Sequence, residues 1–235
     1  MCDEVARESR RSVPRKKKAD VEVEVEEAPE ELTDEETFQL VNLISSVSGP
    51  PERSSKPRIV SLYGEIDEEQ CAEVAFTLLA LSEMGVELEP EVEGGPTGEA
   101  IKLLISTAGG SASDMLAVYD AMRMVKLACP VETIGLGKVM SAGVLLLAAG
   151  TRGKRRIGRN CRVMIHGVAA GAGGAVYSLE NELEEIKHTQ DQYIKLLARE
   201  TDMTVSYIKK LINRKLNVYL TASEAVELGI ADEVV

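Results

Sequence analysis

The chain has 235 residues, 44% of them hydrophobic, which suits one domain with appendages. Its formal net charge of −12 disfavours nucleic acid as a partner of the folded body. Four widely spaced cysteines without a CxxC pair argue against a disulfide scaffold or a metal site. The sequence contains no uninterrupted run of about 18 apolar residues, so a membrane span is not expected. We therefore expect a soluble, cytoplasmic protein that binds neither membrane nor nucleic acid.

Residues 1–57 are predicted to be a disordered acidic extension. The first 36 residues hold 7 basic and 13 acidic side chains, and repulsion among carboxylates opposes a packed structure. A short apolar stretch, TFQLVNLISSV, follows and could be a helix or strand facing a partner, before GPPERSSKPR breaks the chain. The folded domain is therefore placed at residues 58–235.

Apolar runs and helix-period segments alternate from residue 58 onward. Strands are predicted at 58–63, 101–106, 131–136 and 162–165, and helices at 68–84, 111–127 and from 141. The stretch 85–100 is rich in Gly, Pro and Glu and is predicted to be an exposed loop. This order predicts an α/β fold of repeated βαβ units with a largely parallel sheet.

A long polar helix is predicted at 178–201, followed by helices at 205–216 and 222–228. Its apolar residues form only a narrow stripe, which suits an arm that reaches a neighbouring subunit. The stripe consists of Leu179, Leu183, Ile186, Tyr193, Leu196 and Leu197.

Ser141 is the first candidate for chemistry, because it lies between a predicted strand and a helix of small residues. Free N–H groups at such a corner, Ala142 N–H above all, could stabilise the oxyanion formed when a serine attacks an acyl group. The alternative is that Ser141 only caps its helix.

Two further features could complete a site for acyl transfer. The Gly-Gly pair in STAGGS (106–111) could bring a second backbone donor close, or it could be a plain joint or a phosphate cradle. His166 ends an apolar strand and could be a base or a structural histidine, whereas His188 lies on the polar helix and is interpreted as a surface residue.

The segment GKVMSAGVLLLAAGTRGKRRIGRNCRVMIH resembles the serine and histidine region of the Clp protease proteolytic subunit family, with the same spacing from Ser141 to His166. STAGGSASDMLAVYDAM and LTASEAVELGIAD also resemble segments of that family, so the likeness spans residues 58–235. The resemblance implies a crotonase-like α/β fold in which the long helix is a protruding handle. It also implies a serine endopeptidase that cleaves unfolded polypeptides through an acyl-enzyme.

Carried over residue by residue, the resemblance makes Ser141 the nucleophile and His166 the general base, with Gly110 and Ala142 as oxyanion donors. Asn217 stands where the family usually has an aspartate, and Lys215 is a rival alignment that cannot serve. An asparagine can orient the histidine but cannot stabilise the imidazolium with a full charge, so low activity is expected.

The resemblance further implies a homo- or hetero-oligomer of two heptameric rings that works with a hexameric AAA+ Clp unfoldase. The chain itself needs no cofactor, because the unfoldase uses the ATP. The family's aromatic docking positions are occupied here by Lys102, Leu104 and Met124, so the docking surface is divergent.

Three alternatives stay open. The chain could be an inactive or weakly active structural subunit of a mixed Clp ring, which the asparagine favours. It could be a phage maturation protease of the same fold, which the unusual extension suggests. It could also be an acyl-CoA enzyme of the wider crotonase superfamily.

Overall fold

A computed structural model describes residues 57–84, 95–171, 173, 175–213 and 217–235. The chain divides into two units, residues 1–54 and 55–235, and the described residues all belong to the second. The predicted extension, apart from residue 57, lies outside the described residues, as do Lys215 and most of the predicted loop 85–100.

The core of this unit is a sheet of parallel strands. Strands β1 (Ile59–Ile66), β2 (Ile101–Gly110), β3 (Val131–Met140), β4 (Arg155–Ile157) and β7 (Glu233–Val234) are neighbours in that order, and each pair is parallel. Side chains alternate between buried and more exposed along most of β2, as expected for a strand with one face on the core. The predicted α/β class and parallel sheet are confirmed.

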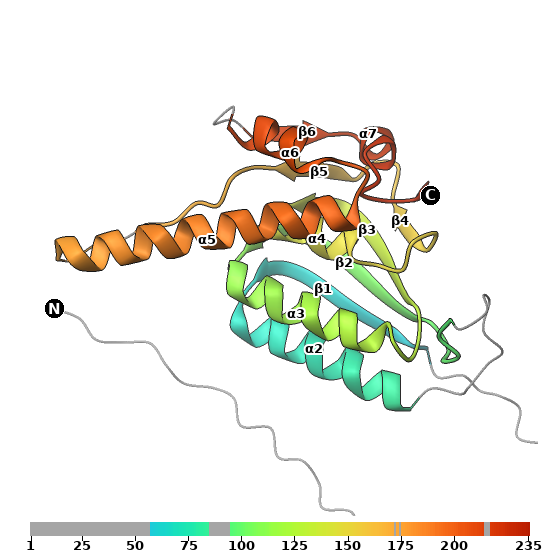
Figure 1. Cartoon of the computed structure of the whole chain (residues 1–235). Helices are drawn as coiled ribbons and strands as arrows, with labels where there is room; N and C mark the ends of the chain where they lie inside the picture. The colour runs from blue at the N-terminus through green and yellow to red at the C-terminus, as the bar shows by residue number, and fades with distance from the viewer. Residues whose placement is uncertain (1–56, 85–94, 172, 174, 214–216) are drawn as a thin grey trace, which may run out of the picture. The chain divides into compact units, whose positions relative to one another are not determined.

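Helices α2 (Glu68–Glu83) and α3 (Ala112–Val125) lie side by side against the first strands (Figure 1). Side chains cap both helices at their first turn: Asp67 accepts a hydrogen bond from Gln70 N–H, and Ser111 accepts one from Asp114 N–H. Helix α4 (Ala142–Ala148) is buried along its whole length and packs against β2 and β3. The caps and the all-apolar sequence of α4 explain why these segments form helices where the pattern predicts them.

Strand β3 has two partners on one side, and this fork positions the site described below. Residues 133–135 pair with β4, whereas residues 138–140 pair with β5 (Arg162–Ile165). Strand β5 is also antiparallel to β6 (Val218–Leu220). Helices α6 (Val205–Ile212) and α7 (Ala222–Glu227) complete this part of the fold.

The sequence pattern does not predict β4, β6 and β7, which have two or three residues each. It also predicts that α6 ends at residue 216, whereas the described helix ends at Ile212. Segments this short have no measurable hydrophobic period, so only the neighbouring strands define them.

Helix α5 (Val176–Glu200) is the predicted long helix, and its first half extends beyond the sheet (Figure 1). Its buried residues, Tyr193, Ile194 and Leu197, lie in the second half, whereas Tyr177 and Leu183 in the first half are exposed. No helix within the described residues is long and apolar enough to cross a membrane.

Arg155 joins the ends of two helices to the C-terminal segment. Its side chain is 2% exposed, and its Nε donates to Asp232 Oδ2 at 2.9 Å. Its Nη1 donates to the carbonyl oxygens of Ala148, Glu200 and Gly229. A buried guanidinium whose donors are occupied in this way holds the ends of α4 and α5 against the C-terminal segment.

Candidate active site

Ser141 lies between the last residue of β3 and the first residue of α4, in a strained backbone conformation. Its φ of 54° and ψ of −121° make it the one non-glycine residue with positive φ in the described part of the chain. Such a conformation costs about 1–3 kcal/mol and persists only where its surroundings hold it. Here Ser141 N–H donates to Met164 O at 2.8 Å, and Ser141 O accepts from Val144 N–H at 3.1 Å.

The Ser141 hydroxyl does not cap helix α4, so the capping interpretation is wrong. Its Oγ lies 2.7 Å from His166 Nε2 instead. When the serine donates this hydrogen bond, the proton of the neutral imidazole is on Nδ1. This is the geometry in which a histidine can remove the hydroxyl proton of a nucleophile.

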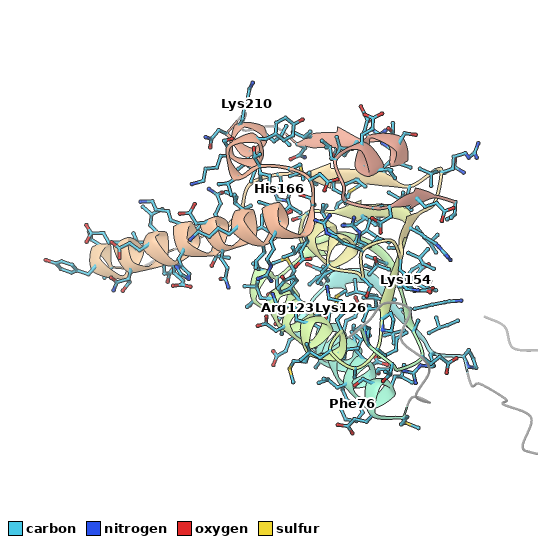
Figure 2. The ribbon with its side chains drawn as sticks, turned by 45° about the vertical axis from the view of Figure 1, so that its right-hand side comes forward. Phe76, Arg123, Lys126, Lys154, His166 and Lys210 are labelled. Atoms are coloured by element: carbon cyan, nitrogen blue, oxygen red, sulfur yellow. The ribbon has the colours of Figure 1, made fainter. Side chains whose placement is uncertain are left out.

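His166 directly follows β5, at the side of helix α5 (Figure 2). The pairing of β3 with β5 places Met140 opposite Met164, so the serine one residue after β3 and the histidine one residue after β5 emerge side by side. The contact between residues 25 positions apart therefore follows from strand register.

A cleft of about 320 Å³ opens over the two side chains. Its lining includes Ser141, His166, Gly110, Ala142 and Tyr193. The structure thus brings four of the five predicted site residues to one cleft, and the Gly-Gly turn lies at the serine rather than at a separate ligand site. None of the hydrogen bonds among described residues uses Ala142 N–H.

The sequence of this chain is similar to those of known proteases. The sequence profile of the Clp protease family matches residues 50–235. The chain belongs to the Clp protease family. Relatives named ATP-dependent Clp protease proteolytic subunit 1, from Corynebacterium jeikeium (strain K411), and subunit 2, from Rhodococcus jostii (strain RHA1), are 33% and 32% identical to it.

These similarities cover most of each protein. The alignment spans 78% of this chain and 90% of the Corynebacterium relative, and 83% of this chain and 91% of the Rhodococcus relative. A subunit 2 from Nocardia farcinica (strain IFM 10152) is 32% identical over 83% of this chain and 87% of its own length. The resemblance to the Clp protease family is therefore confirmed, and the acyl-CoA enzyme alternative is not supported.

Asn217, the predicted third member of the site, does not line the cleft of Ser141. It lines a hollow of about 460 Å³ together with His166, Gln190 and Asn213. Asn217 is exposed, and among the described residues no hydrogen bond joins it to His166. The described residues that line this hollow include three amides and no carboxylate, so the role of Asn217 stays a prediction.

The other candidates lie away from the cleft. His188 is exposed on α5, which agrees with its interpretation as a surface residue. At the positions predicted to face an unfoldase, Lys102 and Met124 are exposed and Leu104 is partly buried. Of these docking positions, only Met124 combines an apolar side chain with high exposure, at 60%.

Tyr193 is the residue of the cleft that the sequence analysis missed as a functional candidate. It was placed in the apolar stripe of the long helix, and its ring is indeed 5% exposed. Its hydroxyl, however, donates to Ser141 O at 3.3 Å. Burial raises the pKa of Tyr193, so the phenol stays protonated and remains a donor at neutral pH.

Proposed function

We propose that this chain is a serine endopeptidase in which Ser141 is the nucleophile and His166 the general base. The observation that supports the proposal best is the 2.7 Å contact between Ser141 Oγ and His166 Nε2 beside an open cleft. Membership in the Clp protease family supports the same activity.

In the proposed reaction, Ser141 Oγ attacks the carbonyl carbon of the scissile peptide bond while His166 Nε2 takes the hydroxyl proton. The backbone N–H groups of Gly110 and Ala142 stabilise the oxyanion of the tetrahedral intermediate. The C–N bond then breaks, and His166 returns the proton to the leaving amine. Water, deprotonated by His166, hydrolyses the acyl-enzyme and restores the serine.

Asn217 is proposed to orient the histidine through His166 Nδ1–H. The proposal is supported by their position, because the two residues line one hollow, and catalytic hydrogen bonds can form only on substrate binding or assembly. An amide gives orientation without a compensating charge, so we expect a slower enzyme than one with a carboxylate.

The names of the relatives suggest that the activity depends on ATP, which a separate AAA+ Clp unfoldase would use. We propose an oligomer of two heptameric rings in the cytoplasm, in which the exposed apolar residues of the first half of α5, such as Tyr177 and Leu183, contact other subunits. Unfolded polypeptides are the proposed substrates, and this chain is proposed to need no cofactor of its own.

A second candidate function is a structural subunit of a mixed ring with weak or no activity of its own. The amide-lined hollow beside His166 favours it, because no described residue there supplies a negative charge to the histidine. Co-purification with an active relative, and an unchanged rate for the mixed particle carrying Ser141→Ala, would support this candidate over the first. The phage maturation protease stays a narrower form of the first proposal.

The test is hydrolysis of fluorogenic peptides by the assembled chain beside three variants. Ser141→Ala and His166→Ala each remove one partner of the 2.7 Å contact and should lower kcat by at least about 10³-fold. Ser206→Ala removes an exposed hydroxyl on α6 and is the matched control, with an unchanged rate expected. Ser141→Ala with the full wild-type rate would overturn the proposal.

A further inference from the structure

The hydroxyl of Tyr193 contacts the peptide group that joins Ser141 to Ala142. Tyr193 comes from the buried half of α5, fifty-two positions along the chain from Ser141, and its hydroxyl is 3.3 Å from Ser141 O. The same oxygen accepts the Val144 N–H at 3.1 Å. Two donors from separate elements therefore fix one carbonyl oxygen.

That carbonyl and the Ala142 N–H belong to one planar group. The peptide bonds of the described residues are all trans, so the N–H points away from the carbonyl oxygen within the same plane. Any rotation that moves Ser141 O also moves the Ala142 N–H through the same angle. A donor that holds the oxygen thereby sets the direction of the N–H at the cleft.

The backbone here needs such support. Ser141 has the strained φ of 54°, and relaxation toward an ordinary conformation would rotate the peptide group that follows it. Val144 N–H belongs to the same short helix as Ala142 and moves with it. Tyr193 belongs to another helix, so its hydrogen bond ties the peptide group to the rest of the fold.

We propose that Tyr193 is a positioning residue that orients the Ala142 N–H toward the oxyanion. This inference rests on the proposed function, because it assigns a role within the same acyl-transfer site. The hydroxyl does not touch the reacting atoms. Its effect is confined to states that carry charge on the substrate oxygen, namely the tetrahedral intermediate and the transition states on either side of it.

The effect should therefore separate kcat from KM. Tyr193→Phe keeps the ring and removes only the hydroxyl. We expect kcat for peptide hydrolysis to fall about 10-fold, less than the 10²- to 10³-fold loss on deleting an oxyanion donor outright, because the N–H remains. KM should stay within about twofold, because the ground state makes little use of this donor.

Tyr119→Phe is the matched control. Tyr119 is also a buried tyrosine, 1% exposed; its hydroxyl donates to Glu200 Oε1 at 2.6 Å and accepts from Arg199 Nη2, so its loss removes partly buried hydrogen bonds away from the cleft. Both variants should lower Tm, since each loses at least one partly buried hydrogen bond. Only Tyr193→Phe should lower kcat.

A peptide boronic acid gives a second measurement, because its adduct with a serine is tetrahedral and anionic. Its affinity for Tyr193→Phe should fall in parallel with kcat/KM, while a non-cleavable substrate analogue should bind as tightly as to wild type. Should Tyr193→Phe fail to assemble, Tyr193→Met replaces the ring with a flexible apolar side chain without an O–H donor and has the same expected result.

Three outcomes decide the matter. A selective loss of kcat and of boronate affinity in Tyr193→Phe supports the proposal. Equal kcat in wild type and Tyr193→Phe, or equal losses in Tyr193→Phe and Tyr119→Phe, overturns it while leaving the proposed function intact. A wild-type particle that neither hydrolyses peptides nor binds the boronate at Ser141 overturns the proposed function and this inference together.

Discussion

Gly109 lies so close to Ser141 that a Cβ atom added to the glycine would stand 2.5 Å from Ser141 Cβ and 3.0 Å from Ser141 Oγ. Its φ of 101° is also one that side chains rarely adopt. The absence of a side chain at Gly109 therefore allows Ser141 to lie close to the end of β2. This role is separate from the proposed donor role of Gly110 N–H.

Gly109→Ala should accordingly displace Ser141, so that Ser141 Oγ moves away from His166 Nε2. A displacement of about 1 Å at a reacting atom can lower kcat about 10²-fold, and we expect a loss of that order in peptide hydrolysis. The matched control is Gly64→Ala, where φ is 99° and no atom of the described residues lies within 4 Å of an added Cβ. The control should lose stability from backbone strain but keep its kcat, and equal losses of activity in both would contradict the account.

The charge missing beside His166 gives a gain-of-function prediction. Asn217→Asp should raise kcat several-fold or more, because a carboxylate can accept from the imidazole and stabilise its protonated form. Steady-state kinetics on assembled particles measures the change.

Asn213→Asp is the control for a general electrostatic effect, since Asn213 lines the same hollow. A rise confined to Asn217→Asp supports its assignment as the third member of the site. Equal rises would point to the added negative charge alone, and no rise in Asn217→Asp would argue against the alignment.

The sheet and the long helices could be predicted from the sequence because their patterns are long. β2 alternates over most of its length, and α5, which has 25 residues, carries an apolar stripe from Leu179 to Leu197, so both stand out from neighbouring segments. By contrast, β4 and β7 gain their identity from pairing with each other through Arg156 opposite Glu233 and Ile157 opposite Val234, which no local pattern reveals.

The site was only partly predictable for a related reason. Ser141 and His166 could be named from the strand-end positions and from the family resemblance, but their contact depends on the register of β3 with β5. The sequence also suggested a cap at Ser141, and the unusual φ that turns the hydroxyl away from that role has no signature in composition. Tyr193 could not be identified from the sequence, because its ring fits the apolar stripe of α5 and the pattern does not show that its hydroxyl donates to Ser141 O.

Asp232 should support the fold through Arg155 in a pH-dependent way. Burial raises the pKa of the Asp232 carboxyl, but the hydrogen bonds and charge of Arg155 outweigh burial and lower the pKa below its usual 3.8. A lowered folded-state pKa means that the stabilisation is present above the unfolded-state pKa and is lost as pH falls through the folded-state value. The difference in free energy of unfolding between wild type and Asp232→Asn should therefore be constant near neutral pH and shrink below about pH 4.

At neutral pH, Asp232→Asn should cost about 3 kcal/mol, because it leaves the 2%-exposed Arg155 without a counter-charge. Glu233→Gln breaks the neighbouring Arg156 pair, whose side chains are 43% and 65% exposed, and should cost less than about 1 kcal/mol. Urea unfolding at one protein concentration compares them, and a larger cost for Glu233→Gln would contradict this account of the core.

Two buried thiols should be inert in the folded chain. Burial raises the pKa of Cys161 to about 11, and burial together with Asp114 and Asp67 raises that of Cys71 to about 11. At pH 8 only a small fraction of either thiol is ionised, and both side chains are 1–2% exposed. Mass spectrometry after iodoacetamide treatment should find both unmodified in native protein and modified after unfolding. Rapid native alkylation of either cysteine would show that its helix or turn opens readily.

The central claim is that Ser141 is an activated nucleophile, and covalent labelling with a fluorophosphonate tests it most directly. Assembled wild-type protein should form one adduct, mapped by peptide mass spectrometry to Ser141, and His166→Ala should slow its formation by at least about 10²-fold. Ser111 lines the same cleft and serves as the internal control: among the described residues its hydroxyl bonds to Ser113 Oγ and Asp114 N–H rather than to a histidine, so it should stay unmodified. An assembled particle with no adduct at Ser141, or one labelled at Ser111 and Ser141 alike, would contradict the account.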